Sequence, residues 1–222
     1  MAEHAIPATS DYEEKLDRLL TVAAEVFAKK GYHNASIRDI ARHAEVSLSG
    51  LYYYFRSKEE LLYKVQSRCF QTVLADLEQR LEGEEAADER LRILVHNHVR
   101  FFARNMAAMR VLSHEYDALE GPYREKIRDL RRRYTDICTE ILRELRRSMG
   151  GADIVPLGVV TFALFGMMNW IYTWYRPDRN VPVDRLAEHL YMLFVGGFVG
   201  RANGSAKRSR SASRRSEART SR

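Results

Sequence analysis

Apolar residues along this chain recur at intervals of three and four, and no stretch alternates convincingly between apolar and polar residues. Intervals of three and four place side chains on one face of an α-helix, whereas alternation would favour a strand. The first such segment begins at Ser10, which has capping-box spacing with Glu13, and Gly31 ends it. Its apolar face holds Leu16, Leu19, Leu20, Ala23, Val26 and Phe27. The pattern therefore predicts a helix over about residues 10–30.

Eight more helices follow from the same reading of the chain. Ser57 and Glu60 form another capping-box pair, an acidic segment over residues 82–88 interrupts the pattern, and paired glycines at 150 and 151 end a long amphipathic stretch. The predicted helices cover about residues 36–43, 47–54, 57–81, 89–104, 107–116, 123–149, 154–175 and 186–199. The sequence therefore predicts an all-α fold of about nine helices.

The two short segments near the N-terminus have the pattern of a helix-turn-helix. Ile37, Ile40 and Ala41 form the buried side of the first helix, Val46 anchors the turn, and Leu51 anchors the second helix. The second helix exposes small and hydroxyl-bearing groups that can lie in a major groove. The candidates for DNA contact on and beside this helix are Ser47, Leu48, Ser49, Gly50, Tyr52 and Tyr53. Lys58 opens the next helix, where its ammonium group and free backbone amides can meet a phosphate.

The same residues resemble the TetR family of transcriptional regulators. The matching stretches read Ser36 to Ala41 (Ser-Ile-Arg-Asp-Ile-Ala), then Ala-Glu-Val-Ser, Leu-Tyr-Tyr-Tyr-Phe and Ser-Lys-Glu, within about residues 12–62. The resemblance implies DNA contacts by Ser36, Arg38, Ser49, Gly50, Tyr52, Tyr53 and Lys58, with Leu48 as a further candidate. One residue departs from the family pattern, because Glu45 replaces the usual glycine of the turn. Glu45 must then accept an unusual backbone angle or use a different turn.

The resemblance also implies the domain organisation and the partners. Residues 1–56 are expected to form the DNA-binding domain, and residues 57–200 a helical ligand-binding and dimerisation domain. A homodimer of this kind binds a palindromic operator in double-stranded DNA, and a small-molecule effector changes that binding. Residues 201–222 contain eight arginines and lysines, one acidic residue and no large apolar residue, so a disordered basic tail is expected there. The net charge of +6 therefore resides in the tail.

Residues 154–175 contain no charged side chain, and on length alone they could cross a bilayer. A membrane-associated helical anchor protein with a basic tail is therefore one alternative. Pro156, Gly158, Gly166 and Asn169 argue against a span, and a helix that is apolar all round can instead be buried on all sides. In the TetR resemblance, the last two helices of each subunit form a four-helix dimer interface and line the effector cavity. Leu193 is placed in this interface.

Residues 165–177 resemble a subset of the family that regulates fatty-acid, phenylacetate and sterol-ring breakdown, several of which bind acyl-CoA thioesters. The predicted cavity lining is mostly apolar, as an acyl chain or ring requires. Its residues are Phe101, Phe102, Tyr134, Phe162, Phe165, Asn169, Trp170 and Tyr172. Arg176, with Arg100 and Arg104, could meet the phosphates of coenzyme A. The alternative is an efflux-type regulator that senses a neutral hydrophobic compound.

Catalytic and metal-binding patterns do not emerge from the chain. His96 and His98 are two residues apart and would point to different sides of a helix, and Cys69 and Cys138 indicate no disulfide framework. The sequence holds no glycine-rich phosphate loop and no Cys-x-x-Cys motif. Its first residues lack a basic start and an apolar run. We therefore expect a cytoplasmic regulator without enzymatic activity, cofactor or metal.

Overall fold

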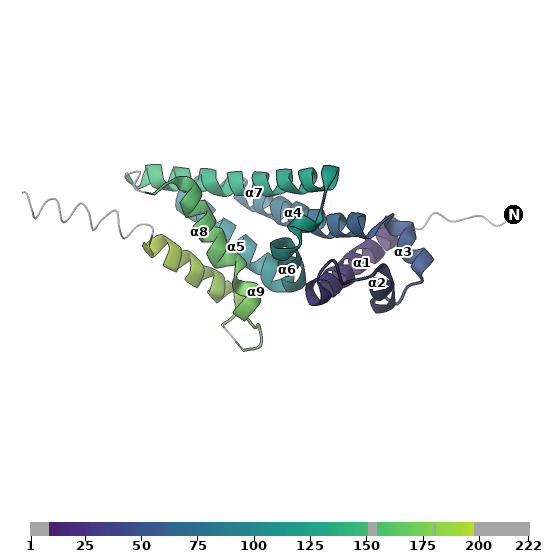
Figure 1. The fold of residues 1–222 in the computed structure, drawn as a ribbon. Coiled ribbons are helices and arrows are strands. Elements are labelled where there is room, and N and C mark those ends of the chain that lie inside the picture. Colours follow the sequence, from purple (N-terminus) through teal and green to yellow (C-terminus); the bar gives the residue numbers. More distant parts are fainter. Residues whose placement is uncertain (1–8, 151–154, 180, 198–222) are drawn as a thin grey trace, which may run out of the picture. The chain divides into compact units, whose positions relative to one another are not determined.

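The computed structural model describes residues 9–150, 155–179 and 181–197 of the chain (Figure 1). Every regular element in these ranges is helical, which confirms the predicted all-α class. The elements are α1 (Thr9–Lys30), α2 (Ile37–His43), α3 (Leu48–Tyr54), α4 (Lys58–Leu81), α5 (Ala87–Arg104), α6 (Met106–His114), the 3-10 helix η1 (Tyr116–Ala118), α7 (Gly121–Ser148), α8 (Leu157–Asn169), α9 (Ile171–Trp174) and a last helix over 183–197. The predicted basic tail, 201–222, lies outside the described residues.

Local signals place the ends of the first helices close to their predicted positions. Helix α1 begins at Thr9, one residue before the predicted start, so Ser10 lies within its first turn. The helix ends at Lys30, and Gly31 follows with φ +77°, a left-handed conformation that glycine adopts without steric cost. Gly83 has the same φ just after α4, and Gly150 has φ +60° just after α7. Glycines thus end α1 and α7 as predicted, and Gly83 lies in the acidic segment that was predicted to end α4.

The apolar segment near the C-terminus is not one continuous helix. Helix α8 ends at Asn169, Trp170 lies between the two helices, and α9 is a single turn. Residues Leu157–Trp174 have the length and apolar composition of a membrane span, but only a third of that window is buried within the chain. The buried side chains alternate with exposed ones, because Leu164 and Ile171 are fully buried while Phe162 is 66% exposed. The segment therefore has one packed face and one apolar face left uncovered in the single chain.

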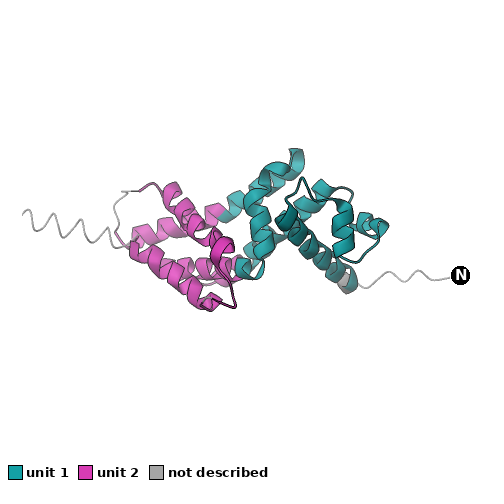
Figure 2. Ribbon diagram, turned by 60° about the horizontal axis from the view of Figure 1, so that its bottom comes forward, with its two compact units in different colours: residues 1–76, 101–134 teal, residues 77–100, 135–222 magenta. Residues whose placement is uncertain are grey.

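The chain divides into two compact units, shown in teal and magenta in Figure 2. Unit 1 contains residues 1–76 and 101–134, and unit 2 contains residues 77–100 and 135–222. The boundary falls inside α4, α5 and α7, so it does not follow the linear division at residue 56. Each unit has its own core, with Phe27, Ile40 and Leu61 fully buried in unit 1 and Leu91 and Leu164 fully buried in unit 2. The domain division at residues 56 and 200 stays a prediction.

Candidate nucleic-acid interface and effector region

Both short helices of the N-terminal segment begin at a serine cap. The Ser36 hydroxyl accepts from the Asp39 amide at 3.1 Å, and the Asp39 carboxylate accepts from the Ser36 amide at 3.1 Å. This reciprocal pair is a capping box and satisfies two exposed amides of α2. Lys30 of α1 lies 2.9 Å from Asp39, and its hydrogen bond, with those from Ser36, lowers the pKa of Asp39 well below the usual range. The start of α2 is thus fixed to the end of α1.

Helix α3 is capped by Ser47, whose hydroxyl accepts from the Gly50 amide at 3.0 Å. A Cβ atom at position 50 would lie 3.1 Å from the Ser47 Oγ, tighter than an ordinary contact. The absence of a side chain at Gly50 therefore keeps the cap intact. In the cap of α4, the Ser57 hydroxyl accepts from the Glu60 amide, but the Glu60 carboxylate accepts from the Arg56 amide. Only half of the capping box predicted for Ser57 and Glu60 therefore forms.

The turn between α2 and α3 resolves the question raised by Glu45. Glu45 has φ 57°, so it takes the left-handed conformation that glycine would adopt easily. Arg18 of α1 braces the turn, because its guanidinium donates to the Ala44 carbonyl at 3.3 Å and lies 3.5 Å from the Glu45 carboxylate. Val46 was predicted to anchor the turn through its side chain, but this residue is 37% exposed. Its backbone amide instead donates to the Ala41 carbonyl.

Helix α3 packs through Leu51, which is 1% exposed, and presents its other side to solvent. Tyr53 is 71% exposed and Tyr52 49% exposed. Behind them, Tyr54 stacks on Tyr12 of α1 with ring centroids 5.0 Å apart. Sequence reasoning missed Tyr12, because nothing in the spacing along α1 indicates that its ring meets α3. The helix thus has a buried anchor, an aromatic support and an exposed face of suitable size for a groove.

The basic residues of this region fall into two groups. Arg38, Arg42 and Arg56 are exposed, and none of their guanidinium groups has a partner among the residues that the structure describes. Lys30 is paired with Asp39, and the Lys58 ammonium lies within 3.4 Å of three backbone carbonyls. Arg38, Arg42 and Arg56 are therefore available to meet phosphates, whereas Lys30 and Lys58 are engaged within the protein.

The residues predicted to line an effector cavity belong to both units. Phe101, Phe102 and Tyr134 lie in unit 1, and the others lie in unit 2. The structure places them in different environments, with Phe102, Tyr134 and Phe165 buried, Phe101, Asn169 and Tyr172 half-buried, and Phe162, Trp170 and Arg176 exposed. The Tyr172 and Trp170 rings meet edge to face, and the Arg176 guanidinium donates to the Tyr175 carbonyl. Their joint role as an effector site stays a prediction.

Asn169 has a partner within unit 2 that the sequence did not indicate. The His98 Nε2 lies 3.0 Å from the Asn169 Oδ1, and the His98 ring packs near Phe165. Burial disfavours the charged imidazolium and lowers the pKa of His98 to about 3, although the bond to Asn169 opposes this effect. His98 is therefore a neutral imidazole that donates to Asn169 at physiological pH.

Each unit contains a cavity. A cavity of about 600 Å³ in unit 1 is bordered by α1, α4 and the ends of α5 and α6, and both Phe101 and Arg104 line it. A smaller one of about 430 Å³ in unit 2 is lined by α5 residues that include Arg100, together with Arg80 and Glu188. The other predicted cavity residues border neither of these two spaces.

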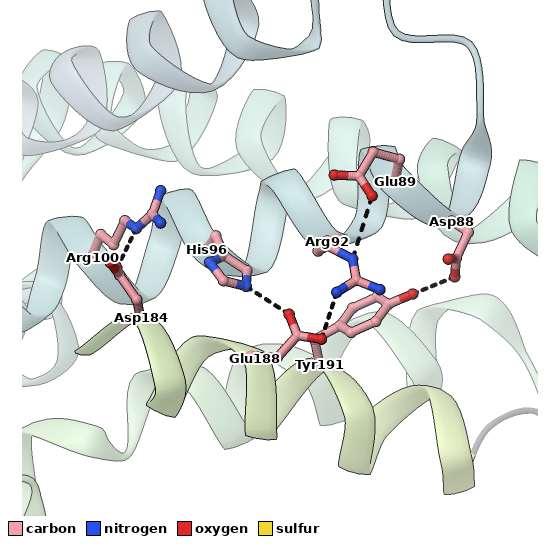
Figure 3. Close-up of polar contacts among 8 residues, drawn as sticks. All are labelled: Asp88, Glu89, Arg92, His96, Arg100, Asp184, Glu188 and Tyr191. Carbon is pink, nitrogen blue, oxygen red and sulfur yellow. Dashed lines mark hydrogen bonds and ion pairs between the residues drawn. The ribbon is translucent and has the colours of Figure 1, made fainter. Parts of the chain in front are cut away.

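A ladder of polar contacts joins the last helix to α5 within unit 2 (Figure 3). Asp184 accepts from the Arg100 Nε at 2.6 Å, and Glu188 lies between Arg92 and His96, with its carboxylate 3.0 Å from the His96 Nε2. Further along, the Tyr191 hydroxyl donates to Asp88, and burial together with this bond raises the pKa of Tyr191 to about 12. Positions 184, 188 and 191 share one face of a helix, so the ladder orients the opposite face away from α5.

His96 and His98 indeed have separate environments, since His96 pairs with Glu188 and His98 with Asn169. Among the described residues, no group of three or more potential ligands could hold a metal ion.

A capped helix-turn-helix followed by a large helical unit defines a class of DNA-binding regulators. Comparison with protein families agrees, because residues 19–65 match the model described as bacterial regulatory proteins, tetR family. Residues 84–198 match the model described as tetracyclin repressor-like, C-terminal domain, which is more than half of the chain. The chain belongs to the TetR family. It is accordingly a dimeric DNA-binding transcriptional regulator.

Individual relatives align over most of the chain. The fatty acid metabolism regulator protein of Bacillus subtilis (strain 168) is 25% identical over 82% of this chain and 95% of its own length. The HTH-type transcriptional activator FasR of Mycolicibacterium smegmatis is 27% identical over 83% of each chain. A solved TetR-family transcriptional regulator from Bordetella parapertussis 12822 is 33% identical, covers 85% of this chain and 98% of its own, and superposes with a TM-score of 0.77.

Proposed function

We propose that this regulator is a repressor of a catabolic operon and that an acyl-CoA thioester releases it from its operator. The observation that carries the DNA-binding part is the geometry of α3, a helix capped by Ser47 and anchored by Leu51 that leaves Tyr52 and Tyr53 exposed. Support for the effector class comes from a relative named as a fatty acid metabolism regulator, found on an alignment that spans most of the chain. The alternative is a neutral hydrophobic effector of the efflux type.

In this proposal α3 enters the major groove and the exposed arginines lie along the phosphates. Ser49, Tyr52 and Tyr53 meet base edges or phosphates, and Arg38 contributes a phosphate contact. Ser47 and Gly50 contribute mainly through the cap, since the Ser47 hydroxyl already accepts from the Gly50 amide. Ser36 and Leu48, which are both exposed, are weaker candidates for contact.

The DNA contacts can be tested by alanine substitution of Tyr52 and Arg38. Each change should weaken operator binding by about 1–3 kcal/mol, because it removes a base-edge or phosphate contact. Circular dichroism and sedimentation should show an unchanged helical dimer. Fluorescence anisotropy with operator and random DNA measures the effect, and normal operator affinity in both variants would exclude α3 as the recognition helix.

The dimer interface is proposed to lie on α8, the turn at Trp170 and the last helix. Large apolar side chains are exposed there in the single chain, with Phe162 66%, Trp170 60%, Met192 59% and Leu193 68% exposed. An apolar surface of this kind is typical of a face that a second subunit covers. The polar ladder to α5 supports this assignment, because it leaves Met192 and Leu193 on the outer side of the last helix.

The effector class can be tested on the protein–operator complex by titration with acyl-CoA thioesters, the matching free acids and free coenzyme A. Release by the thioester alone is expected, and it should be weaker in Phe101→Ala and Arg176→Ala, residues of the predicted site. Sedimentation of each variant controls for loss of the dimer. If no thioester shifts the equilibrium while an unrelated neutral hydrophobic compound does, the effector proposal is wrong and the DNA-binding assignment stands unaffected.

A further inference from the structure

The Lys58 side chain, at the start of α4, is directed at the protein's own backbone. Its ammonium nitrogen lies 3.0 Å from the Tyr32 carbonyl, 3.0 Å from the Ala35 carbonyl and 3.4 Å from the His33 carbonyl. It also lies 4.4 Å from the centroid of the Tyr32 ring. An ammonium group has three N–H donors, and these three acceptors can use them all. A phosphate contact by this side chain would have to displace the carbonyls and the aromatic face.

The three carbonyls belong to the segment that connects α1 to α2. This segment begins at Gly31, with φ +77°, passes through Ala35, which is 2% exposed, and leads directly into the Ser36 cap of α2. These carbonyls lie between the two helices, where no intrahelical amide donates to them, and a cation can satisfy them. Lys58 thus binds the chain at the point that determines where α2, and with it α3, begins.

The same segment is held a second time, from the end of α6. The Tyr32 amide donates to the Glu115 Oε1 at 3.1 Å, and the Glu115 carbonyl accepts from the Gln66 side chain of α4 at 3.1 Å. Gln66 is fully buried, so this second attachment is well sheltered from water. Tyr32 therefore has its amide fixed by Glu115 and its carbonyl fixed by Lys58. All of these contacts lie within unit 1.

We infer that Lys58 is a positioning residue, whose ammonium group fixes the connection between α1 and α2 and so places the helix-turn-helix, rather than a residue whose side chain contacts DNA. This goes beyond the proposed function, because it gives the Lys58 side chain a role other than the phosphate contact that the sequence predicted. It also explains how position 58 can serve DNA binding without a free cation. A phosphate can still meet the backbone amides at the start of α4, which no substitution of the side chain removes.

The salt dependence of operator binding separates the two roles. Each phosphate contact contributes about −0.9 to the slope of log K against log salt concentration. Loss of one contact per subunit therefore makes the slope of a dimer less negative by about 1.8. We expect Lys58→Met to weaken operator binding about ten-fold at every salt concentration with an unchanged slope. Arg38→Ala is the matched comparison. The Arg38 side chain is exposed, so its removal should make the slope less negative by the full amount of about 1.8. The inference would be overturned if the slope for Lys58→Met became less negative by as much as the slope for Arg38→Ala.

A second measurement distinguishes positioning by Lys58 from a role in stability alone. It is the ratio of operator affinity to random-DNA affinity, measured well below the unfolding temperature of each variant. A misplaced helix-turn-helix lowers this ratio, whereas a folded protein that is merely less stable keeps the wild-type ratio. We expect Lys58→Met and Glu115→Leu both to lower it, and Glu115→Gln, which keeps the Oε1 acceptor, to retain it. A wild-type ratio in Lys58→Met would exclude positioning.

A measurement on the unaltered protein covers the case in which Lys58→Met does not fold. Acetylation of individual lysines by a small anhydride can be followed by mass spectrometry with and without operator DNA. Lys58 should react slowly in free protein and at the same rate when DNA is bound, because its ammonium group is already engaged. Fast reaction in free protein with protection only by DNA would instead show a phosphate contact and overturn the inference.

Discussion

At the scale of single residues, Glu45 shows how the fold accommodates an unfavourable backbone conformation. A non-glycine residue in the left-handed region costs about 1–2 kcal/mol, because its Cβ approaches a backbone oxygen. The turn keeps this conformation because the Ala44 and Val46 amides donate to the Ile40 and Ala41 carbonyls and Arg18 braces the Ala44 carbonyl. The ion pair of Glu45 with Arg18 offsets little of the cost, since the Glu45 side chain is 82% exposed.

Glycine at this position should therefore be better than alanine. Glu45→Gly relieves the strain and Glu45→Ala retains it, while both lose the same exposed ion pair. We expect Glu45→Gly to be more stable than Glu45→Ala by about 1 kcal/mol, although the greater freedom of glycine in the unfolded chain offsets part of the gain. Thermal unfolding at one fixed protein concentration measures the difference. An alanine variant as stable as the glycine variant would show that the strain has no energetic consequence.

His98 predicts a loss of stability in mild acid. Its pKa falls from 6.5 to about 3 on folding, so the native state resists a proton that the unfolded chain accepts. Stability from this residue is therefore complete above pH 6.5 and is lost progressively as the pH falls toward 3. At pH 5 the loss should be about 2 kcal/mol. His98→Gln should unfold with a smaller pH dependence between 7 and 5 than the wild type. Identical pH dependence in His98→Gln and the wild type would contradict this account.

At the scale of elements, the last helix depends on α5 for its orientation. The ladder in Figure 3 places Glu188 between two α5 side chains, and the hydrogen bonds from His96 and Arg92 lower the pKa of Glu188 even though burial opposes that shift. Asp184 pairs with Arg100 and is 63% exposed, whereas the Glu188 side chain is 32% exposed. The two acids on the same helix thus differ in burial.

This difference predicts unequal effects of removing each acid. Glu188→Ala leaves Arg92 and His96 without their shared carboxylate and should cost about 1–2 kcal/mol. Asp184→Ala removes one exposed ion pair and should cost less than about 0.5 kcal/mol. Thermal unfolding at fixed concentration gives both values. Equal effects would mean that the ladder does not depend on Glu188.

At the scale of the whole molecule, the exposed apolar face of α8 and the last helix fits the dimer that DNA binding by this family requires. A palindromic operator presents two half-sites, so a single recognition helix reads only one of them. The exposure of Phe162, Trp170 and Leu193 in the single chain is costly in water unless a partner covers them.

Leu193→Glu tests the position of the interface. The change costs little in a single chain, where Leu193 is 68% exposed, but it would bury an unpaired carboxylate in the proposed dimer, at a cost of several kcal/mol. Analytical ultracentrifugation should show helical monomers that no longer bind a palindromic operator with high affinity. Ser113→Glu, on the exposed side of α6, is the control and should remain dimeric. A dimer that survives Leu193→Glu unaltered would place the interface elsewhere.

The sequence by itself determined the features that depend on neighbours a few residues away. Ser36 and Ser47 cap their helices because a hydroxyl reaches an amide three residues on, and Gly31 ends α1 because only glycine turns left-handed without cost. The family resemblance identified the class of protein. It could do so from the sequence because the helix-turn-helix motif is one continuous segment of the chain. The break at Trp170 escaped the sequence, because an apolar run has no periodicity that distinguishes one helix from two.

Only the tertiary structure decided which distant groups meet. Lys58 contacts carbonyls 23 to 26 residues away, His98 meets Asn169 across 71 residues, and Glu188 meets α5 across more than 90. From the sequence alone Lys58 looked like a phosphate ligand and Asn169 like an effector ligand, because each side chain can form such bonds. Which bond forms depends on the packing of helices distant in sequence, since a buried polar group takes the partner that the fold brings within 3 Å.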